Sequence, residues 1–294
     1  MYSARDLLIE VDGMSKLLYA GFRRYFKSLL FWLALVASVV LGIISGFKVK
    51  EDAVFDDVFT VVGFILYAIL LSLMIGREFG DRVIKNKIIS GHTKGSIFVS
   101  EYILSIAVCL LLCSVSALIF ALFNLDLIGR MLPELLVKSI VGYFLLIVSM
   151  ITATVSVCML TSNRAVMAIA VLVLILATFM ISYELDDRLE RPEYYMQLEV
   201  VDGIHTLVQG TEKNPHYIDR PQRDVYNFFK RIIPHGQAID YLRMVYPWLE
   251  PINVTLHLTE EEASLLNTLP FYSIGTICAS FALGYIGFRK KEIK

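Results

Sequence analysis

The sequence predicts an all-α integral membrane protein with six transmembrane helices. Of the 294 residues, 56% are hydrophobic and only 19% are charged, and the mean hydropathy is +0.64. A soluble domain cannot bury that much apolar surface. The charged residues are also segregated between apolar blocks. The formal net charge of -1 therefore identifies no partner, because it averages over that segregation.

Six apolar blocks account for the predicted helices. A helix needs roughly 20 apolar residues to cross the hydrocarbon core of a bilayer. The blocks cover residues 29–47, 58–76, 97–124, 135–161, 165–183 and 269–288. Only three residues, Ser162, Asn163 and Arg164, separate the fourth block from the fifth. The two blocks together are too long for one crossing, so they predict a tight helical hairpin.

The distribution of lysine and arginine predicts the orientation. With both termini in the cytoplasm, the cytoplasmic segments carry 15 of these residues, whereas the two short outer loops together with Lys138 at the start of the fourth block carry 4. The segment 184–268 is left out because long translocated loops do not follow the positive-inside rule. The bias predicts a multi-pass membrane protein with both ends in the cytoplasm.

The N-terminal segment 1–28 contains an amphipathic stretch at 14–28. One helical face carries Leu17, Leu18, Gly21, Phe22, Tyr25 and Leu29, whereas Lys16, Arg23, Arg24 and Lys27 lie elsewhere. This pattern is typical of a helix that lies in the membrane interface. Its role is either simple anchoring to anionic lipid or that of an elbow helix that couples to a cytoplasmic partner.

The segment 77–95, between the second and third blocks, is amphipathic, mixed in charge and broken at Gly91. It predicts a short cytoplasmic helix along the membrane. We expect Val83, Ile84 and Ile88 to point inward and Lys85 and Lys87 to be exposed. Such a segment is either a solvated connector or a docking element for a partner.

The segment 184–268 is rich in aromatic residues, which favours folded structure over a linker. Asp219 before Pro221 and Gln222, and Thr259 before Glu262, have the spacing of helix N-terminal capping boxes. We therefore expect a mostly helical extracellular cap between spans five and six. It either gates a pathway or covers the ends of the spans.

Small residues and one acid stand out inside the apolar blocks. Small residues recur at helical spacing in the first and last blocks, where they permit either close helix packing or a pathway lining: Ala34, Ser38, Gly42, Gly46, Thr276, Ser280 and Gly284. Glu101 lies near the cytoplasmic end of the third block. An intramembrane acid is a functional candidate, although at this depth it can also reach interfacial water or a neighbouring base.

Several catalytic and binding motifs are missing from the sequence. It has no G-x-x-x-x-G-K-[ST] phosphate loop, no H-E-x-x-H or G-x-S-x-G motif and no Cys/His zinc spacing. We therefore expect no catalytic residue, metal or cofactor in this chain. The basic residues near position 23 adjoin a span, which indicates membrane lipid rather than nucleic acid.

Three stretches resemble bacterial type-2 ABC exporter permeases. Residues 76–103 read GREFGDRVIKNKIISGHTKGSIFVSEYI, similar to the segment after the second span of that family. The ending GFRKKEIK at 287–294 and the loop stretch PHGQA at 234–238 are further matches. The resemblance implies a coupling helix at 77–95 that docks on an ATPase, with these matching positions: Glu78, Asp81, Lys85, Lys87, Gly91 and His92.

The resemblance also implies a location in a bacterial plasma membrane, the function and the partners. The chain would be the membrane-spanning permease subunit of an ATP-driven exporter for a hydrophobic or amphipathic substrate, and not itself an enzyme. Two ATP-binding cassette subunits would hold ATP and magnesium, and a second copy or a related permease would complete the pathway. The alternatives are a membrane-embedded protease or lipid-modifying enzyme, and a non-transporting sensor or scaffold partnered with an ATPase.

The domain organisation follows from these elements. Residues 1–28 form the N-terminal segment, 29–183 hold spans one to five with the coupling helix, 184–268 form the extracellular cap, and 269–294 form span six with a basic tail.

Overall fold

The computed structural model describes residues 4–51, 62–201, 204–249 and 259–292. In these residues, six helices are long and apolar enough to cross a membrane, as predicted. The protein is therefore a multi-pass membrane protein. The six helices are α2 (Leu29–Glu51), α4 (Gly63–Gly80), α6 (Lys94–Phe123), α8 (Pro133–Leu160), α9 (Arg164–Glu190) and α12 (Glu260–Lys290).

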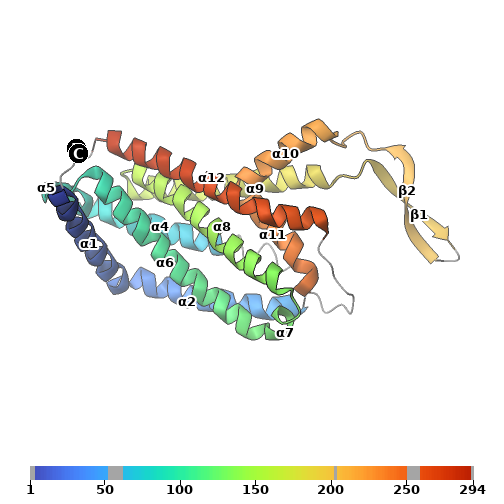
Figure 1. The fold of residues 1–294 in the computed structure, drawn as a ribbon, viewed down its shortest axis with the longest axis horizontal. Coiled ribbons are helices and arrows are strands. Elements are labelled where there is room, and N and C mark those ends of the chain that lie inside the picture. Colours follow the sequence, from blue (N-terminus) through green and yellow to red (C-terminus); the bar gives the residue numbers. More distant parts are fainter. Residues whose placement is uncertain (1–3, 52–61, 202–203, 250–258, 293–294) are drawn as a thin grey trace.

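The helices form one elongated bundle with two different ends (Figure 1). We call one the terminal end, because α1 (Ala4–Lys27) and the last turn of α12 both lie there, together with the short helix α5 (Val83–Ile89). We call the other the hairpin end. It carries α7 (Leu125–Ile128), α10 (Arg220–Ile232), α11 (Pro234–Leu249) and the strands β1 (Tyr194–Val201) and β2 (Ile204–Lys213).

Three close helix pairs build the bundle: α12 packs along α8, α2 along α6, and α4 along α9. The core between them consists of aliphatic and aromatic side chains, including the fully buried Leu71, Ile75, Phe98 and Leu112. The outward faces of α2, α9 and α12 carry many exposed apolar side chains. Such faces are expected where a bundle contacts lipid rather than water.

Several helix limits differ from those predicted. Helix α4 continues to Gly80 and α6 begins at Lys94, so the predicted coupling helix 77–95 shortens to α5. Helix α9 continues to Glu190, and α12 begins at Glu260 instead of 269. These extensions are polar turns beyond the apolar blocks, which hydropathy alone does not register. The predicted start of span two at residue 58 lies outside the described residues.

The segment 184–268 contains an antiparallel hairpin that was not predicted. Strand β1 pairs with β2 in a register that sets Val201 opposite Ile204. The sequence between those two residues is Asp202-Gly203, a strong two-residue hairpin signal. The aromatic residues and the capping patterns favour helices in this segment, whereas Asp202-Gly203 is the local signal that favours a hairpin.

The two predicted capping boxes have different outcomes. At α12, the Thr259 hydroxyl accepts from the Glu262 backbone N–H, and the Glu262 carboxylate accepts from the Thr259 N–H. That box is confirmed. At α10, Asp219 precedes the helix but makes no side-chain capping hydrogen bond. The prediction of a capping box at Asp219 is therefore wrong.

Candidate functional site

Helix α5 is set apart from its neighbours by two left-handed residues. Arg82 before it has φ of 57°, and Gly91 shortly after it has φ of 93°. Glycine adopts this conformation freely, whereas arginine does so at a cost in free energy. The chain therefore leaves α4 abruptly, forms seven helical residues, and turns again before α6. These turns place α5 as a separate element at the terminal end (Figure 1).

A buried ion cluster anchors α5 to the bundle. The Lys87 Nζ atom of α5 lies 2.7 Å from the Glu78 Oε2 atom of α4 and also contacts the Glu101 carboxylate of α6. The other carboxylate oxygen of Glu78, Oε1, lies 3.0 Å from the Arg24 Nη1 atom of α1. The side chains of Glu78, Lys87 and Glu101 are at most 8% exposed. One cluster thus joins four helices.

The cluster places two carboxyl groups opposite two basic side chains. Burial favours the neutral form of Lys87, but the charges of Glu101 and Glu78 outweigh burial and raise the pKa of Lys87. Burial, together with the same two carboxylates, also raises the pKa of the adjacent Tyr25 well above its ordinary value. The lysine therefore remains charged and bound to both acids. Such a cluster holds helices together and fixes their mutual positions.

The prediction that Lys87 is exposed is wrong. Because α4 continues to Gly80 and Arg82 is left-handed, the helical phase of α5 turns Lys87 inward, beside the buried Ile84. The predicted inward position of Ile84 is confirmed, at 1% exposure. Lys85 is exposed as predicted. Sequence reasoning missed Ile89, which is 74% exposed at the C-terminal end of α5.

The remaining predicted coupling residues lie outside the ion cluster. Asp81 is exposed, with its carboxylate 3.3 Å from the Arg77 Nε atom and 3.7 Å from the Arg164 Nη2 atom. Gly91 is exposed, and a Cβ atom there would meet nothing within 4 Å. His92 is half-buried, with its ring beside Gly13 of α1. The structure therefore divides the predicted set into buried anchors and an exposed surface.

The predicted small-residue stripes lie in helix contacts. A Cβ atom at Gly42 would lie 2.7 Å from the Ser116 carbonyl oxygen, and one at Gly46 would lie 2.7 Å from Phe123 Cβ. In α12, a Cβ atom at Gly284 would lie 2.3 Å from Ser156 Oγ. Only glycine permits such close approach without a shift. The other stripe residues are also in the interior or in helix contacts. Ala34 and Ser38 are buried. The Ser280 carbonyl oxygen accepts a hydrogen bond from Ser156 Oγ, and the Thr276 hydroxyl donates one to the Ile232 carbonyl oxygen.

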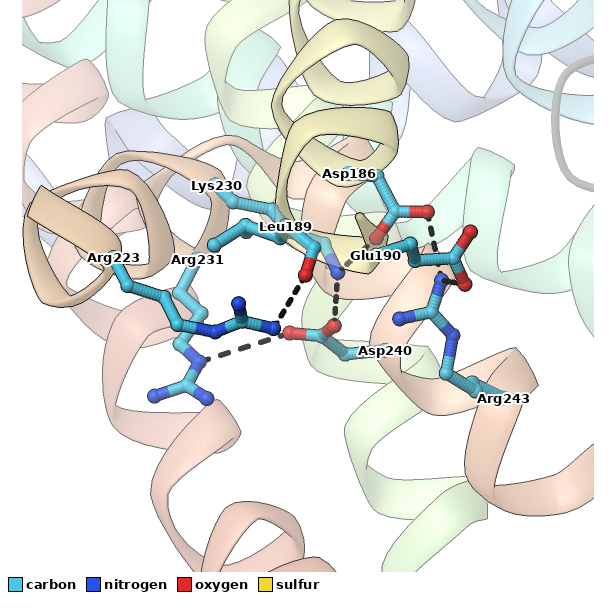
Figure 2. Close-up of polar contacts among 8 residues, drawn as sticks. All are labelled: Asp186, Leu189, Glu190, Arg223, Lys230, Arg231, Asp240 and Arg243. Atoms are coloured by element: carbon cyan, nitrogen blue, oxygen red, sulfur yellow. Dashed lines mark hydrogen bonds and ion pairs between the residues drawn. The ribbon is translucent and has the colours of Figure 1, made fainter. Parts of the chain in front are cut away.

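A second ion network lies at the hairpin end and was not predicted (Figure 2). The Lys230 Nζ atom of α10 lies 2.6 Å from Asp186 of α9 and also contacts Asp240 of α11. Arg243 of α11 lies 2.8 Å from Asp186 and 2.5 Å from Glu190. The Lys230 side chain is 3% exposed. The network ties the end of α9 to both cap helices.

The first turn of α11 packs closely against the end of α10. A Cβ atom at Gly236 would lie 2.1 Å from the Lys230 carbonyl oxygen. Next to it, Ser273 Oγ of α12 donates to the Gln237 Oε1 atom at 2.5 Å. The His235 ring lies between Phe64 and Phe179, and burial lowers the pKa of His235 to about 4. These contacts fix α11 against α4, α9 and α12.

The interior between α4 and α8 leaves almost no open space. The gap there, lined by residues such as Tyr67, Leu71 and Met150, has a volume of about 10 Å³. That volume is at most the size of one water molecule. In this conformation, the gap between α4 and α8 admits nothing larger than one water molecule.

No family model matches the chain, and no curated protein matches it significantly.

Proposed function

We propose that the protein is the membrane-spanning permease subunit of an ATP-driven exporter and that α5 is its coupling helix. The observation that carries the proposal is the anchoring of α5. Its Lys87 is bound by Glu78 and Glu101, so a push on α5 is transmitted directly to α4 and α6. A segment that only connects two spans in water would not require a buried lysine bound to one carboxylate on each of those spans.

The outward surface of α5 supports docking on another protein. Ile89 is 74% exposed at the terminal end, and Lys85 is exposed beside it. A large exposed apolar residue next to a charge is typical of a small contact surface. The partner ATP-binding cassette subunit would bind ATP and magnesium, because this sequence has no phosphate loop.

The pathway itself would form between two permease chains. The interior of one chain is closed between α4 and α8. Exposed apolar faces on α2, α9 and α12 offer contact surfaces to lipid and to a second copy or a related permease. With this arrangement the terminal end, which carries α5, faces the cytoplasm, in agreement with the charge bias of the sequence. A hydrophobic or amphipathic substrate fits such apolar surfaces.

The test is affinity purification of the full chain from the native membrane. We expect an ATP-hydrolysing subunit with a phosphate loop to copurify in equal amount. An Ile89→Asp variant should lose it while the chain remains folded and monodisperse. The matched control is Met196→Asp, which changes a 53% exposed apolar residue on the hairpin and should retain the subunit. If no such subunit copurifies, or if Ile89→Asp retains it, the proposal is wrong.

A further inference from the structure

A cavity of about 680 Å³ lies at the terminal end of the bundle. It is a half-open pocket lined by the C-terminal half of α1, the start of α2, the last turns of α4 and Val83 of α5. Its volume falls within the range of small-molecule binding sites. None of the contacts that hold α5 in place requires this space to be open.

Four basic and two acidic side chains line the cavity. The basic ones are Arg23, Arg24, Lys27 and Arg77, and the acidic ones are Glu78 and Asp81. Both acids are already paired with basic side chains. Glu78 is bound by Arg24 and Lys87, and Asp81 by Arg77 and Arg164. The charge that remains at the cavity is therefore positive.

Arg23 and Lys27 supply that positive charge. Both are exposed, and neither makes an ion pair with any residue that the structure describes. They are four positions apart on α1, so their side chains are neighbours on the helix surface, where like charges repel each other. An anion held between them would replace this repulsion with two favourable contacts. A phosphate group is the anion that suits a pair of basic side chains.

The inner wall of the cavity is apolar and belongs to the spanning helices. Leu30 lies in the first turn of α2, and Met74 lies in α4. One turn into α2, Trp32 is 53% exposed and its indole N–H donates to the Phe26 carbonyl at 2.9 Å. Exposed tryptophan is enriched at the headgroup level of a bilayer. The cavity is therefore at the depth of the headgroups, with its wall continuing toward the acyl chains.

We propose that this cavity binds one anionic phospholipid. The headgroup phosphate would lie between Arg23 and Lys27, and the upper acyl chain would lie along Leu30 and Met74. A free phosphate would satisfy the basic pair but would leave the apolar wall without a partner. The inference does not rest on the proposed function.

The experiment uses the purified full chain in a neutral detergent, with thermal unfolding and native mass spectrometry as readouts. Phosphatidylglycerol should raise the unfolding temperature and remain bound as a single copy. Phosphatidylcholine and inorganic phosphate at the same concentration should do neither. The double variant Arg23→Gln/Lys27→Gln should weaken phosphatidylglycerol binding by about tenfold or more, since each basic residue near the membrane surface adds roughly a factor of five.

The matched control is Arg289→Gln/Lys290→Gln, which removes the same charge from exposed positions at the same end but outside the cavity. It should bind phosphatidylglycerol like the unchanged chain. Equal weakening in both double variants would indicate a general surface charge effect and overturn the proposal. Equal stabilisation by inorganic phosphate would make the ligand a free anion. Loss of a copurifying protein from Arg23→Gln/Lys27→Gln, with lipid binding unchanged, would make the cavity a protein contact instead. Each of these two last results would overturn the proposed lipid site.

Discussion

Lys87 is the residue on which the position of α5 depends. Its ammonium group is the shared partner of two buried carboxylates, Glu78 and Glu101. Removing one partner from a buried ion cluster leaves an uncompensated charge, which costs about 3–5 kcal/mol. We expect Lys87→Met to lower the free energy of unfolding by about that amount, measured by denaturant or thermal unfolding in detergent.

Lys85→Met is the matched control for this prediction. Lys85 lies on the same helix but is exposed. Its replacement should change the stability by at most about 0.5 kcal/mol. Equal losses in the two variants would show that the buried cluster contributes nothing specific.

Because His235 is buried, we expect the stability of the protein to decrease at acid pH. Its pKa is lowered by burial from 6.5 to about 4 in the folded chain. Between these values the unfolded chain takes up a proton that the folded chain does not, so the stability falls as the pH falls through this window. The loss is on the order of 3 kcal/mol by pH 4. Thermal unfolding in detergent at pH 7, 6, 5 and 4 measures it.

His235→Phe is the comparison for the pH series. A phenylalanine ring can occupy the space between Phe64 and Phe179 and cannot take up a proton. The variant should lose less stability than the unchanged chain between pH 6.5 and 4. The same decrease in both chains would assign the acid sensitivity to other groups.

Only some of these residue roles are accessible from the sequence. Glu101 was recognised as a candidate because an acid in an apolar block is rare, and one expected partner was a neighbouring base, which the structure identifies as Lys87. The inward direction of Lys87 was missed, since it depends on the left-handed turn at Arg82. Lys230 and Asp186 are 44 positions apart, so no local pattern indicates their contact.

At the scale of elements, the turn between α10 and α11 is the tightest feature of the cap. A Cβ atom at Gly236 would lie 2.1 Å from a backbone oxygen, which cannot move aside as a flexible side chain can. We expect Gly236→Ala to destabilise the protein by roughly 1–3 kcal/mol. Limited proteolysis of the cap, together with thermal unfolding, measures the effect.

Gly275→Ala is the control within α12. A Cβ atom at Gly275 would meet nothing within 4 Å. Alanine is favoured over glycine in a helix by about 1 kcal/mol, so this variant should be as stable as the unchanged chain or more stable. If Gly236→Ala is equally well tolerated, the close packing of the turn is not required.

Helices and strands differ in how well the sequence predicts them. The six spans follow from hydropathy because the bilayer sets their minimum length. Their polar extensions, such as the last turn of α9 to Glu190, depend on salt bridges and caps that hydropathy does not register. In β1, apolar and polar residues alternate from Met196 to Val200, and the two residues Asp202-Gly203 between the strands are a second hairpin signal.

At the scale of the whole molecule, six crossings place the two ends of the bundle on opposite sides of the membrane. In a chain with its four cysteines replaced by alanine, Met196→Cys on the hairpin should react with a membrane-impermeant maleimide in intact cells. Lys85→Cys on α5 should react only after the cells are permeabilised. Labelling of both positions in intact cells would contradict the proposed orientation.

The account as a whole rests on α5 as the element through which an external ATPase acts. The ion cluster connects α5 to the spanning helices, and the exposed surface of Ile89 and Lys85 offers a contact for a partner. The lipid cavity adjoins this point through Arg24, which links α1 to Glu78. A direct test must therefore examine contact at α5 and its response to nucleotide.

The most direct measurement is disulfide or maleimide cross-linking from Lys85→Cys in native membranes, with the cross-linked product identified by mass spectrometry. The account predicts a product with a subunit that contains a phosphate loop, formed at a rate that changes when ATP is bound or hydrolysis is blocked by vanadate. Transport or enzymatic activity of the lone chain, or a cross-linking pattern with no such subunit, would contradict it.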